Sequence, residues 1–279
     1  MRDFTAPFEA AVSPTLNTIH IDPMRFGMIV PSSNVTMERE LPTMLANRHE
    51  CASGKFSFHA SRVRMKSVTP EELSKMNKQA ARSAGELADA AVDVVAYACL
   101  VAVMAEGRGA HRQAEADIGK ALQENGCDAP VVTSAGALVD TLKDINVKRT
   151  AVIAPYAPAL TAKVCDYIVN EGVELADVRS LNVTDNTAVG KLNPYNLIEI
   201  AAEMPSDIDA LVLSACVQMP SLPALQIVED MLGIPVITAA SATMFQCLKR
   251  VDRPTRIEGA GRLLSGVYDT LNIHQEIIQ

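Results

Sequence analysis

The sequence has no tryptophan, few aromatic residues and no excess of basic side chains. Its formal net charge is -8, and no Lys/Arg run is interleaved with aromatics, which argues against nucleic acid as a partner. The same charge disfavours an anionic membrane surface, and no apolar stretch reaches the ~18–20 residues that a membrane span needs. Residues 1–14 include acidic side chains and no hydrophobic signal core. We therefore expect a cytoplasmic protein with no membrane partner.

Metal-binding cysteine motifs are also missing. The six cysteines show no CxxC or CxxxC spacing, and His49 beside Cys51 has no further ligand cluster around it. We expect no metal site and, in a reducing compartment, free thiols.

What the sequence does contain is typical of helices covering a parallel sheet. Hydrophobic residues make up 48% of the 279 residues, and only 4% are aromatic. From Arg25 onward, short apolar runs alternate with longer helical patterns, which predicts βα units. Eight runs are candidate strands, four in each half of the chain: residues 26–30, 56–65, 92–97, 130–133, 150–154, 174–181, 210–213 and 235–238.

The two sets of strands belong to an internal repeat. Three segments recur in the same order: RFGMIVP and RTAVIAP (25–31 and 149–155), AYAC and LSAC (96–99 and 213–216), and PVVTSAGA and PVITAASA (130–137 and 235–242). We predict an α/β fold of two similar four-stranded, flavodoxin-like parallel-sheet domains. A pseudo-two-fold would relate them, with the active site in the cleft between them.

The expected boundaries follow from this repeat. Residues 1–23 would form an N-terminal extension, 24–138 the first α/β half and 139–242 the second. The remaining segment, 243–279, is interpreted as a helix that packs back on the first half. A capping box from Thr69 to Glu72, with a proline in the first helical position, predicts the start of the helix between the second and third strands.

Two cysteines occupy equivalent positions in the repeat. Cys99 and Cys216 each directly follow an apolar run and directly precede a helical pattern. Ligands of open parallel sheets bind beyond the carboxyl ends of the strands, and the first turn of a helix favours a thiolate. A single such cysteine would more often be a buried, inert residue. The equivalent pair predicts two thiols aimed at one small molecule.

The other thiols and a lone histidine have ordinary explanations. Cys165 and Cys247 fall inside helical patterns, where packing explains them. Cys51 and Cys127 lie in connecting segments and are expected to be exposed. His111 is expected to be an exposed helix residue.

Three polar residues follow predicted strands and carry no formal charge. Asn34 ends a Ser-Ser-Asn run that would equally cap a helix, Tyr156 follows Pro155, and Asn186 lies in a turn-like segment. None of the three is persuasive alone.

Together these segments resemble the maleate cis-trans isomerases, a family within the aspartate/glutamate racemase superfamily. The resemblance extends from about Arg25 to Tyr268, and Pro220 and the long N-terminal extension depart from it. The matching segments are residues 29–38, 97–102, 131–138, 154–156, 185–186, 213–219 and 261–266.

The resemblance implies a cofactor-free conversion of maleate, a small dicarboxylate, to fumarate through a covalent succinyl-cysteine. It implies that Cys99 is the nucleophile and Cys216 the proton donor. It also implies a homodimer and a place in nicotinate or related aromatic catabolism. The substrate-binding groups would be the side chains of Asn34, Tyr156 and Asn186 and the backbone amides of Leu100, Val101 and Val217.

Other functions also fit two facing thiols. A cofactor-independent racemase of an amino acid or hydantoin would exchange an α-proton between them, whereas an arylmalonate decarboxylase needs only one. A small-molecule binding protein without activity, or a scaffold with buried cysteines, would use neither.

Overall fold

The computed structural model describes residues 23–47, 56–65 and 69–269. Within these residues all eight predicted strands are present, close to their expected bounds. The expected N-terminal extension lies almost wholly outside the described residues, and the first strand begins at Met24.

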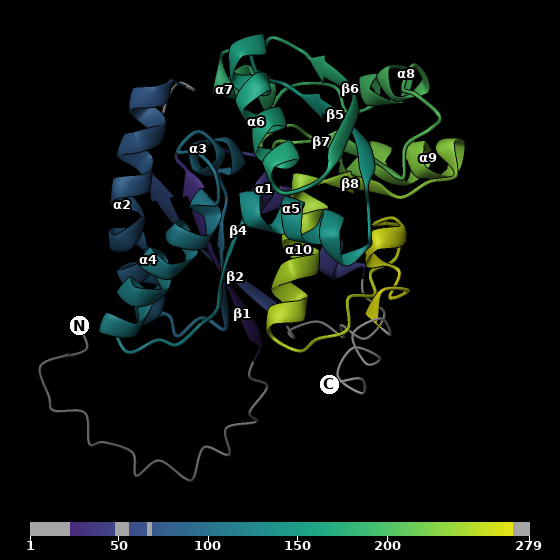
Figure 1. The fold of residues 1–279 in the computed structure, drawn as a ribbon. Coiled ribbons are helices and arrows are strands. Elements are labelled where there is room, and N and C mark those ends of the chain that lie inside the picture. The colour runs from purple at the N-terminus through teal and green to yellow at the C-terminus, as the bar shows by residue number, and fades with distance from the viewer. Residues whose placement is uncertain (1–22, 48–55, 66–68, 270–279) are drawn as a thin grey trace, which may run out of the picture.

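The strands form two parallel sheets with the same strand order. The first has the order β2-β1-β3-β4 and the second β6-β5-β7-β8, so the predicted pair of four-stranded sheets is confirmed (Figure 1). The bounds are β1 (Met24–Pro31), β2 (Phe56–Val63), β3 (Val94–Tyr97), β4 (Val131–Thr133), β5 (Arg149–Ala154), β6 (Glu174–Ser180), β7 (Ala210–Ser214) and β8 (Val236–Thr238).

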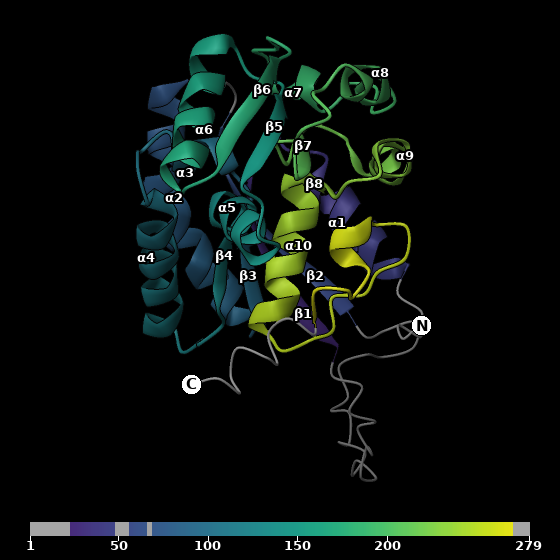
Figure 2. The ribbon, with the colours of Figure 1, turned by 45° about the vertical axis from the view of Figure 1, so that its right-hand side comes forward.

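Helices cover both sheets, which explains the almost continuous apolar runs of the central strands. Helices α2 and α4 lie along one side of the first sheet, and Figure 2 shows α6 on one side of the second sheet with α8 and α9 on the other. The helices are α1 (Met37–Ala46), α2 (Pro70–Asp89), α3 (Leu100–Met104), α4 (Ala110–Glu124), α5 (Ser134–Asp144), α6 (Pro158–Asn170), α7 (Asn186–Val189), α8 (Asn196–Ala202), α9 (Leu222–Leu232) and α10 (Ala239–Arg250), with a 3-10 turn η1 (Arg262–Leu264).

The repeat extends to individual hydrogen bonds. The Ala98 N–H donates to the carbonyl of Ile29 over 2.8 Å, and the Ala215 N–H donates to that of Ile153 over 2.9 Å. In the alignment of the two halves these four residues are equivalent in pairs. Each bond connects the residue before a cysteine to a central strand of its sheet, β1 in the first sheet and β5 in the second.

The equivalent helices α5 and α10 begin with equivalent caps. Thr133 accepts a hydrogen bond from the N–H of Gly136, and Thr238 accepts one from the N–H of Ser241. The two helices pack against each other at the junction of the halves, and α10 also contacts β3 and β4. The cap predicted at Thr69 is likewise present, because its hydroxyl accepts from the N–H of Glu72.

The C-terminal segment differs from the prediction of one helix over residues 243–279. Helix α10 ends at Arg250. Asp252 adopts a left-handed φ of 50°, and Pro254, which cannot continue a helix, follows it. Residues 251–269 contain no helix apart from the short 3-10 turn η1. The prediction of one helix over 243–279 is therefore wrong up to residue 269. Residues 270–279 lie outside the described part.

Candidate active site

The two cysteines lie just beyond the carboxyl ends of equivalent strands. Cys99 follows β3 and Cys216 follows β7, and each side chain is only 5% exposed. Burial is the main cause that raises the pKa of Cys99, and a charge on Cys216 raises it further, so the thiols are close enough to interact electrostatically. Both sit where ligands of parallel sheets bind.

Cys99 is the N-cap residue of α3, as its sequence pattern predicts. Its sulfur receives a backbone N–H from Ala102, but burial outweighs this and raises the pKa of the thiol to about 12. Helix α3 has only five residues, so its dipole is small. The expectation that this position favours a thiolate is therefore wrong for the substrate-free protein.

Cys216 has a richer set of donors. The N–H of Gln218 lies 3.4 Å from its sulfur, and the backbone of Met219 and the hydroxyl of Tyr156 also act on it. Burial raises the pKa of Cys216, and these donors lower it. Because α9 begins only at Leu222, the prediction that a helix directly follows this cysteine is wrong.

Tyr156 lies in the loop between β5 and α6 and is almost fully buried. Its hydroxyl donates to the carbonyl of Ala215 over 3.1 Å. Burial raises the pKa of Tyr156 well above its usual range, and the nearby charge of a cysteine thiolate raises it further. The side chain therefore stays a neutral donor at any physiological pH.

Asn34 combines the capping role and the binding role that its position suggests. Its Oδ1 accepts the N–H groups of Thr36 and Met37, both over 3.0 Å, at the start of α1. Its Nδ2 is buried and has no hydrogen-bond partner among the described residues. An unpaired buried donor costs about 1–3 kcal/mol, so this amide is available to a ligand.

Asn186 comes from the second half and reaches the loop that carries Asn34. It is the first residue of α7, where Asp185 provides the cap. Its Nδ2 donates to the hydroxyl of Ser33 over 2.7 Å, and its side chain is buried. An amide nitrogen carries two hydrogens, so one is left for a ligand.

The backbone amides of Leu100, Val101 and Val217 lie next to the two thiols in the chain. The first two open α3, and first-turn amides have no partner within a helix. None of the three donates a hydrogen bond to an acceptor in the described part of the chain. Their N–H groups are therefore free to bind an anion.

Two buried polar residues of the site were missed by sequence reasoning. Glu40, in α1, accepts the N–H groups of Ser221 and Leu222 at the start of α9. Burial raises the pKa of Glu40. Gln218 bridges the two halves. Glu40 has no sequence signature, since it acts through contacts with the other half, whereas Gln218 lies in the matching segment 213–219 but shows its role only in the folded structure.

His111 and Cys127 are buried, against expectation. The Nδ1 of His111 lies 2.5 Å from the hydroxyl of Tyr167, which ties α4 to α6, and burial lowers the pKa of the imidazole. Cys127 donates to the carbonyl of Val92. Cys165 and Cys247 lie in α6 and α10 as predicted, whereas Cys51 lies outside the described residues.

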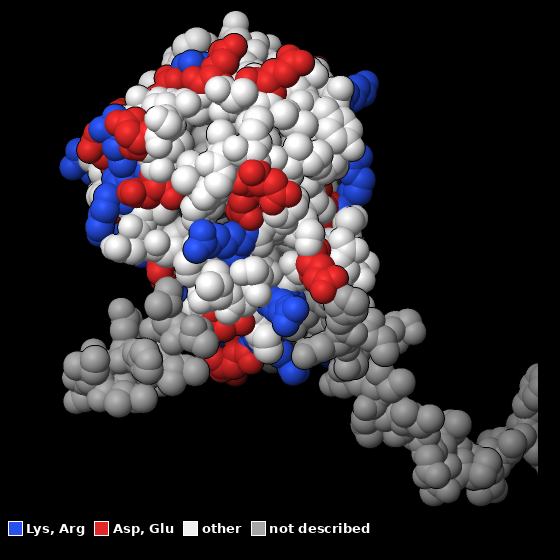
Figure 3. All heavy atoms as spheres, turned by 90° about the vertical axis from the view of Figure 1, so that its right-hand side faces the viewer, with Lys and Arg blue, Asp and Glu red and all other residues white. Residues whose placement is uncertain are grey.

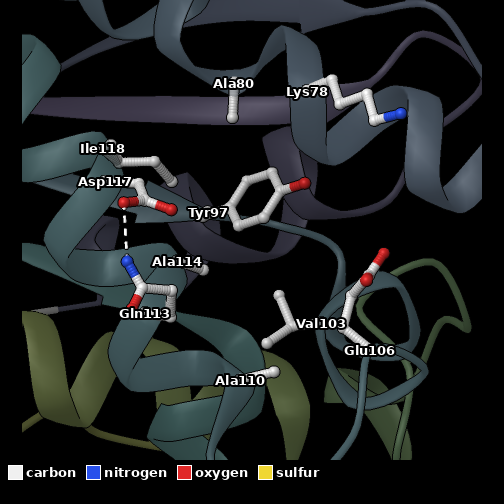
Figure 4. Close-up of a pocket in the computed structure, with 10 residues that line it drawn as sticks. All are labelled: Lys78, Ala80, Tyr97, Val103, Glu106, Ala110, Gln113, Ala114, Asp117 and Ile118. Carbon is white, nitrogen blue, oxygen red and sulfur yellow. Dashed lines mark hydrogen bonds between the residues drawn. The ribbon is translucent and has the colours of Figure 1, made fainter.

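Two cavities help to delimit the site. One of about 190 Å³ borders Tyr156 between α2 and α6, and the exposed Lys163 lines it. Another of about 320 Å³ is lined by α2, α3 and α4 and surrounds Tyr97, as Figure 4 shows. Neither thiol lines either cavity, and only the first includes a candidate site residue, Tyr156. The described residues contain no cluster of groups suited to a metal ion and no helix able to cross a membrane.

Known proteins resemble the chain over most of its length. The family model for arylmalonate decarboxylase matches residues 26–264. Maleate isomerase of Alcaligenes faecalis is 52% identical and covers 87% of this chain and 97% of its own length. The maleate isomerase of Geobacillus stearothermophilus is 51% identical, and the match covers 88% of this chain and 98% of that protein. An arylmalonate decarboxylase from Bordetella bronchiseptica is 25% identical, and the match covers 48% of this chain and 57% of that protein.

Solved structures agree with these sequences. The maleate isomerase Iso of Pseudomonas putida S16, solved with maleate as a cysteine-to-alanine variant, has a TM-score of 0.85 at 49% identity, covering 88% of this chain and 98% of its own. The Nocardia farcinica maleate cis-trans isomerase has a TM-score of 0.83 at 44% identity, covering 86% of this chain and 98% of its own. That structure is a cysteine-to-serine mutant with a covalently bound succinylcysteine intermediate. An arylmalonate decarboxylase mutant, at 22% identity and a TM-score of 0.75, shares the fold.

Proposed function

The chain belongs to the maleate isomerase family, and from this premise we propose that it converts maleate to fumarate with Cys99 as nucleophile and Cys216 as proton donor. The observation that carries the proposal is the pair of buried thiols at equivalent strand ends, beside polar groups that lack partners. A dicarboxylate matches amide and hydroxyl donors that carry no charge of their own.

The reaction must turn a double bond into a single bond for a moment. The sulfur of Cys99 adds to one olefinic carbon of maleate, and the π electrons move to the other carbon and its carboxylate. Cys216 then gives its proton to that carbon, and the proton lost by Cys99 restores Cys216. Compared with maleate, the succinyl group has gained one bond to sulfur and one hydrogen. Rotation about its central bond, followed by the reverse steps, releases fumarate.

The two thiols suit different roles. Three donors act on the sulfur of Cys216, namely the hydroxyl of Tyr156 and the backbone groups of Gln218 and Met219. They stabilise its thiolate, which helps it to release a proton. Cys99 has only the Ala102 N–H, so its thiolate, once formed, is less stabilised and more nucleophilic.

Developing charge is the main barrier, because maleate is already a dianion. Preorganised donors must stabilise the extra charge on a carboxylate when sulfur adds. The unpaired Nδ2 of Asn34, the amide of Asn186 and the free N–H groups of Leu100, Val101 and Val217 would supply them. The hydroxyl of Tyr156 would serve both the substrate and Cys216.

An unprotonated carbanion that lives long enough to rotate is the alternative route. Conversion in heavy water distinguishes the two, since proton transfer from Cys216 would place solvent deuterium in fumarate. Fumarate without deuterium would assign rotation to the carbanion.

The proposal is tested by mixing the purified protein with maleate and no added cofactor. We expect a loss of maleate absorbance in the ultraviolet and fumarate as the product in the proton NMR spectrum. The racemase alternative predicts instead that optically pure aspartate or a hydantoin loses its rotation while maleate is unchanged. No comparison favours that alternative.

A homodimer and a role in nicotinate or related aromatic catabolism rest on the resemblance, a cytoplasmic location rests on the charge and composition of the sequence, and all three are part of the proposal. Three large apolar side chains are about half exposed on or beside α8 and α9, namely Tyr195, Ile227 and Met231. Figure 3 shows wide uncharged areas between scattered charges on that side of the molecule. Such a face suits a second copy of the chain, and light scattering after size-exclusion chromatography measures the mass.

A further inference from the structure

Gln218 makes three hydrogen bonds with its side chain, each to a loop of the site. Its Nε2 donates to the carbonyl of Ser33 over 3.0 Å and to that of Asn186 over 2.9 Å. Its Oε1 accepts the N–H of Val35 over 2.9 Å. The amide thus uses both hydrogens and its oxygen, and it is only 2% exposed.

These bonds bring together the two loops that carry the candidate carboxylate-binding amides. Ser33 and Val35 flank Asn34 in the first half, whereas Asn186 and Gln218 belong to the second. Thr36 adds a further bond, since its hydroxyl donates to the backbone carbonyl of Gln218 over 2.7 Å. The side chain of Gln218 therefore makes three of the hydrogen bonds that hold Asn34 relative to Asn186, beside the direct bond from the Asn186 amide to the hydroxyl of Ser33.

Few other side chains can make this connection. Glutamate has the same length but no hydrogen to give to either carbonyl, and asparagine is one carbon shorter. The side chain of Gln218 also packs tightly against Gly190, because a Cβ on Gly190 would lie 2.7 Å from the Nε2 of Gln218. Gly190 has an ordinary helical φ of -67°, so its lack of a side chain serves space rather than backbone conformation.

We propose that Gln218 is the positioning residue that sets the separation between Asn34 and Asn186, and thereby fits the cleft to the two carboxylates of one substrate molecule. The proposal rests on the proposed function of those amides. Gln218 does not itself bind the substrate. It determines whether both amides reach the same dianion.

The first test compares Gln218→Met with Gln246→Met. Gln246 is a matched control because it is also buried and bridges the halves, with its Nε2 donating to Thr141 over 3.2 Å and to Asp144 over 2.7 Å, at the α5–α10 contact. We expect both variants to lower the melting temperature to a similar degree. Only Gln218→Met should lower kcat/KM for maleate, by about 10², the usual cost of a 1 Å misplacement.

A second pair of variants applies if Gln218→Met does not fold. Gly190→Ala leaves every hydrogen-bonding group in place and pushes on the amide of Gln218. Gly119→Ala, in α4, is its control, because the nearest atom to a Cβ there is 3.9 Å away. We expect a raised KM for maleate in Gly190→Ala and an unchanged KM in Gly119→Ala. The rate of Cys99 alkylation by iodoacetamide, a neutral reagent that needs neither amide, should stay the same in both.

The outcomes separate this proposal from the proposed function. If the wild-type protein does not isomerise maleate, the proposed function fails and this proposal fails with it. If the wild type is active and both Gln218→Met and Gly190→Ala keep kcat/KM within about threefold of it, only the positioning role of Gln218 is overturned. A raised KM in these two variants, with active controls, supports it.

Discussion

The hydroxyl of Tyr156 is within hydrogen-bonding reach of both the sulfur of Cys216 and the carbonyl oxygen of Ala215. A hydroxyl has a single hydrogen, so it donates to the carbonyl while Cys216 is a thiol and can turn to the sulfur when a thiolate forms. Tyr156 therefore responds to the protonation state of the thiol that we propose as proton donor.

Tyr156→Phe tests this response. We expect kcat/KM for maleate to fall by about 10²–10³, the usual loss for one preorganised donor, because phenylalanine cannot stabilise the Cys216 thiolate or a carboxylate. The free energy of unfolding should fall by about 1–3 kcal/mol, because the buried carbonyl of Ala215 loses its donor, and the protein should still fold. Tyr167→Phe is the control, because it also removes a buried hydroxyl, the one that contacts His111. Equal activity of the two variants would show that Tyr156 has no role in the reaction.

Asn34→Asp separates the capping role of Asn34 from its binding role. Aspartate keeps an oxygen for the N–H groups of Thr36 and Met37, so the cap is preserved, and the loss of stability is limited to the cost of burying a carboxylate. It loses the unpaired amide hydrogens and adds a negative charge beside a dianionic substrate. We expect turnover to fall by at least 10². Asn34→Ala should lose both, with a stability cost of about 1 kcal/mol from the missing cap; an active Asn34→Asp variant would contradict the binding role.

The pH dependence of Cys99 alkylation tests its environment. Burial raises its pKa to about 12, so below that pH the thiolate fraction, and with it the iodoacetamide rate, should rise about tenfold per pH unit. The alkylation rate of an ordinary thiol would level off once the pH passes its pKa of ~8.5. The shape of the profile, followed by mass spectrometry of the Cys99 peptide from pH 7 to 10, is independent of how easily the reagent enters. A plateau within that range would show that a low-pKa thiolate is already present.

Lys163 is exposed beside the cavity that borders Tyr156 and is the one cation among the residues lining it. A lysine there attracts a dianionic substrate, and salt screens this attraction. We expect Lys163→Glu to lower kcat/KM for maleate several-fold at low ionic strength and less at high ionic strength. Lys148→Glu makes the same change in net charge at the opposite, amino end of β5 and should have little effect. Equal salt dependence in the two variants would argue against entry beside Lys163.

The repeat made much of the fold predictable. The apolar runs predicted the eight strands, the matching segments paired six of them between the halves, and the hydrogen bonds of Ala98 and Ala215 follow the same alignment. The sequence pattern also led to the two cysteines and the three polar side chains, although their roles came from the family resemblance. Apolar periodicity could not show that α10 ends at Arg250, because Asp252 breaks the helix through its backbone conformation.

Contacts between the halves were the part that could not be predicted. Gln218 lies two residues after Cys216 and Glu40 lies in a helical pattern, but only the folded structure brings Gln218 to Ser33 and Asn186 and brings Glu40 to the start of α9. His111 was expected to be an exposed helix residue, yet Tyr167 from the other half contacts it and it is buried. The pKa of Cys99 was misjudged for a similar reason, since burial by surrounding elements outweighs the short helix that follows it.

The most direct test of the two-thiol mechanism is the mass of Cys216→Ser after incubation with maleate. In Cys216→Ser the sulfur of Cys99 can still add to maleate and water can supply the proton, but no Cys216 thiolate is left to remove a proton for elimination. We therefore predict a retained adduct, seen as a mass increase equal to one molecule of maleic acid and located by peptide mapping on Cys99. Cys99→Ser, treated in the same way, should keep its original mass. An adduct on another cysteine, or full activity in either variant, would contradict the assignment of Cys99 as nucleophile and Cys216 as proton donor.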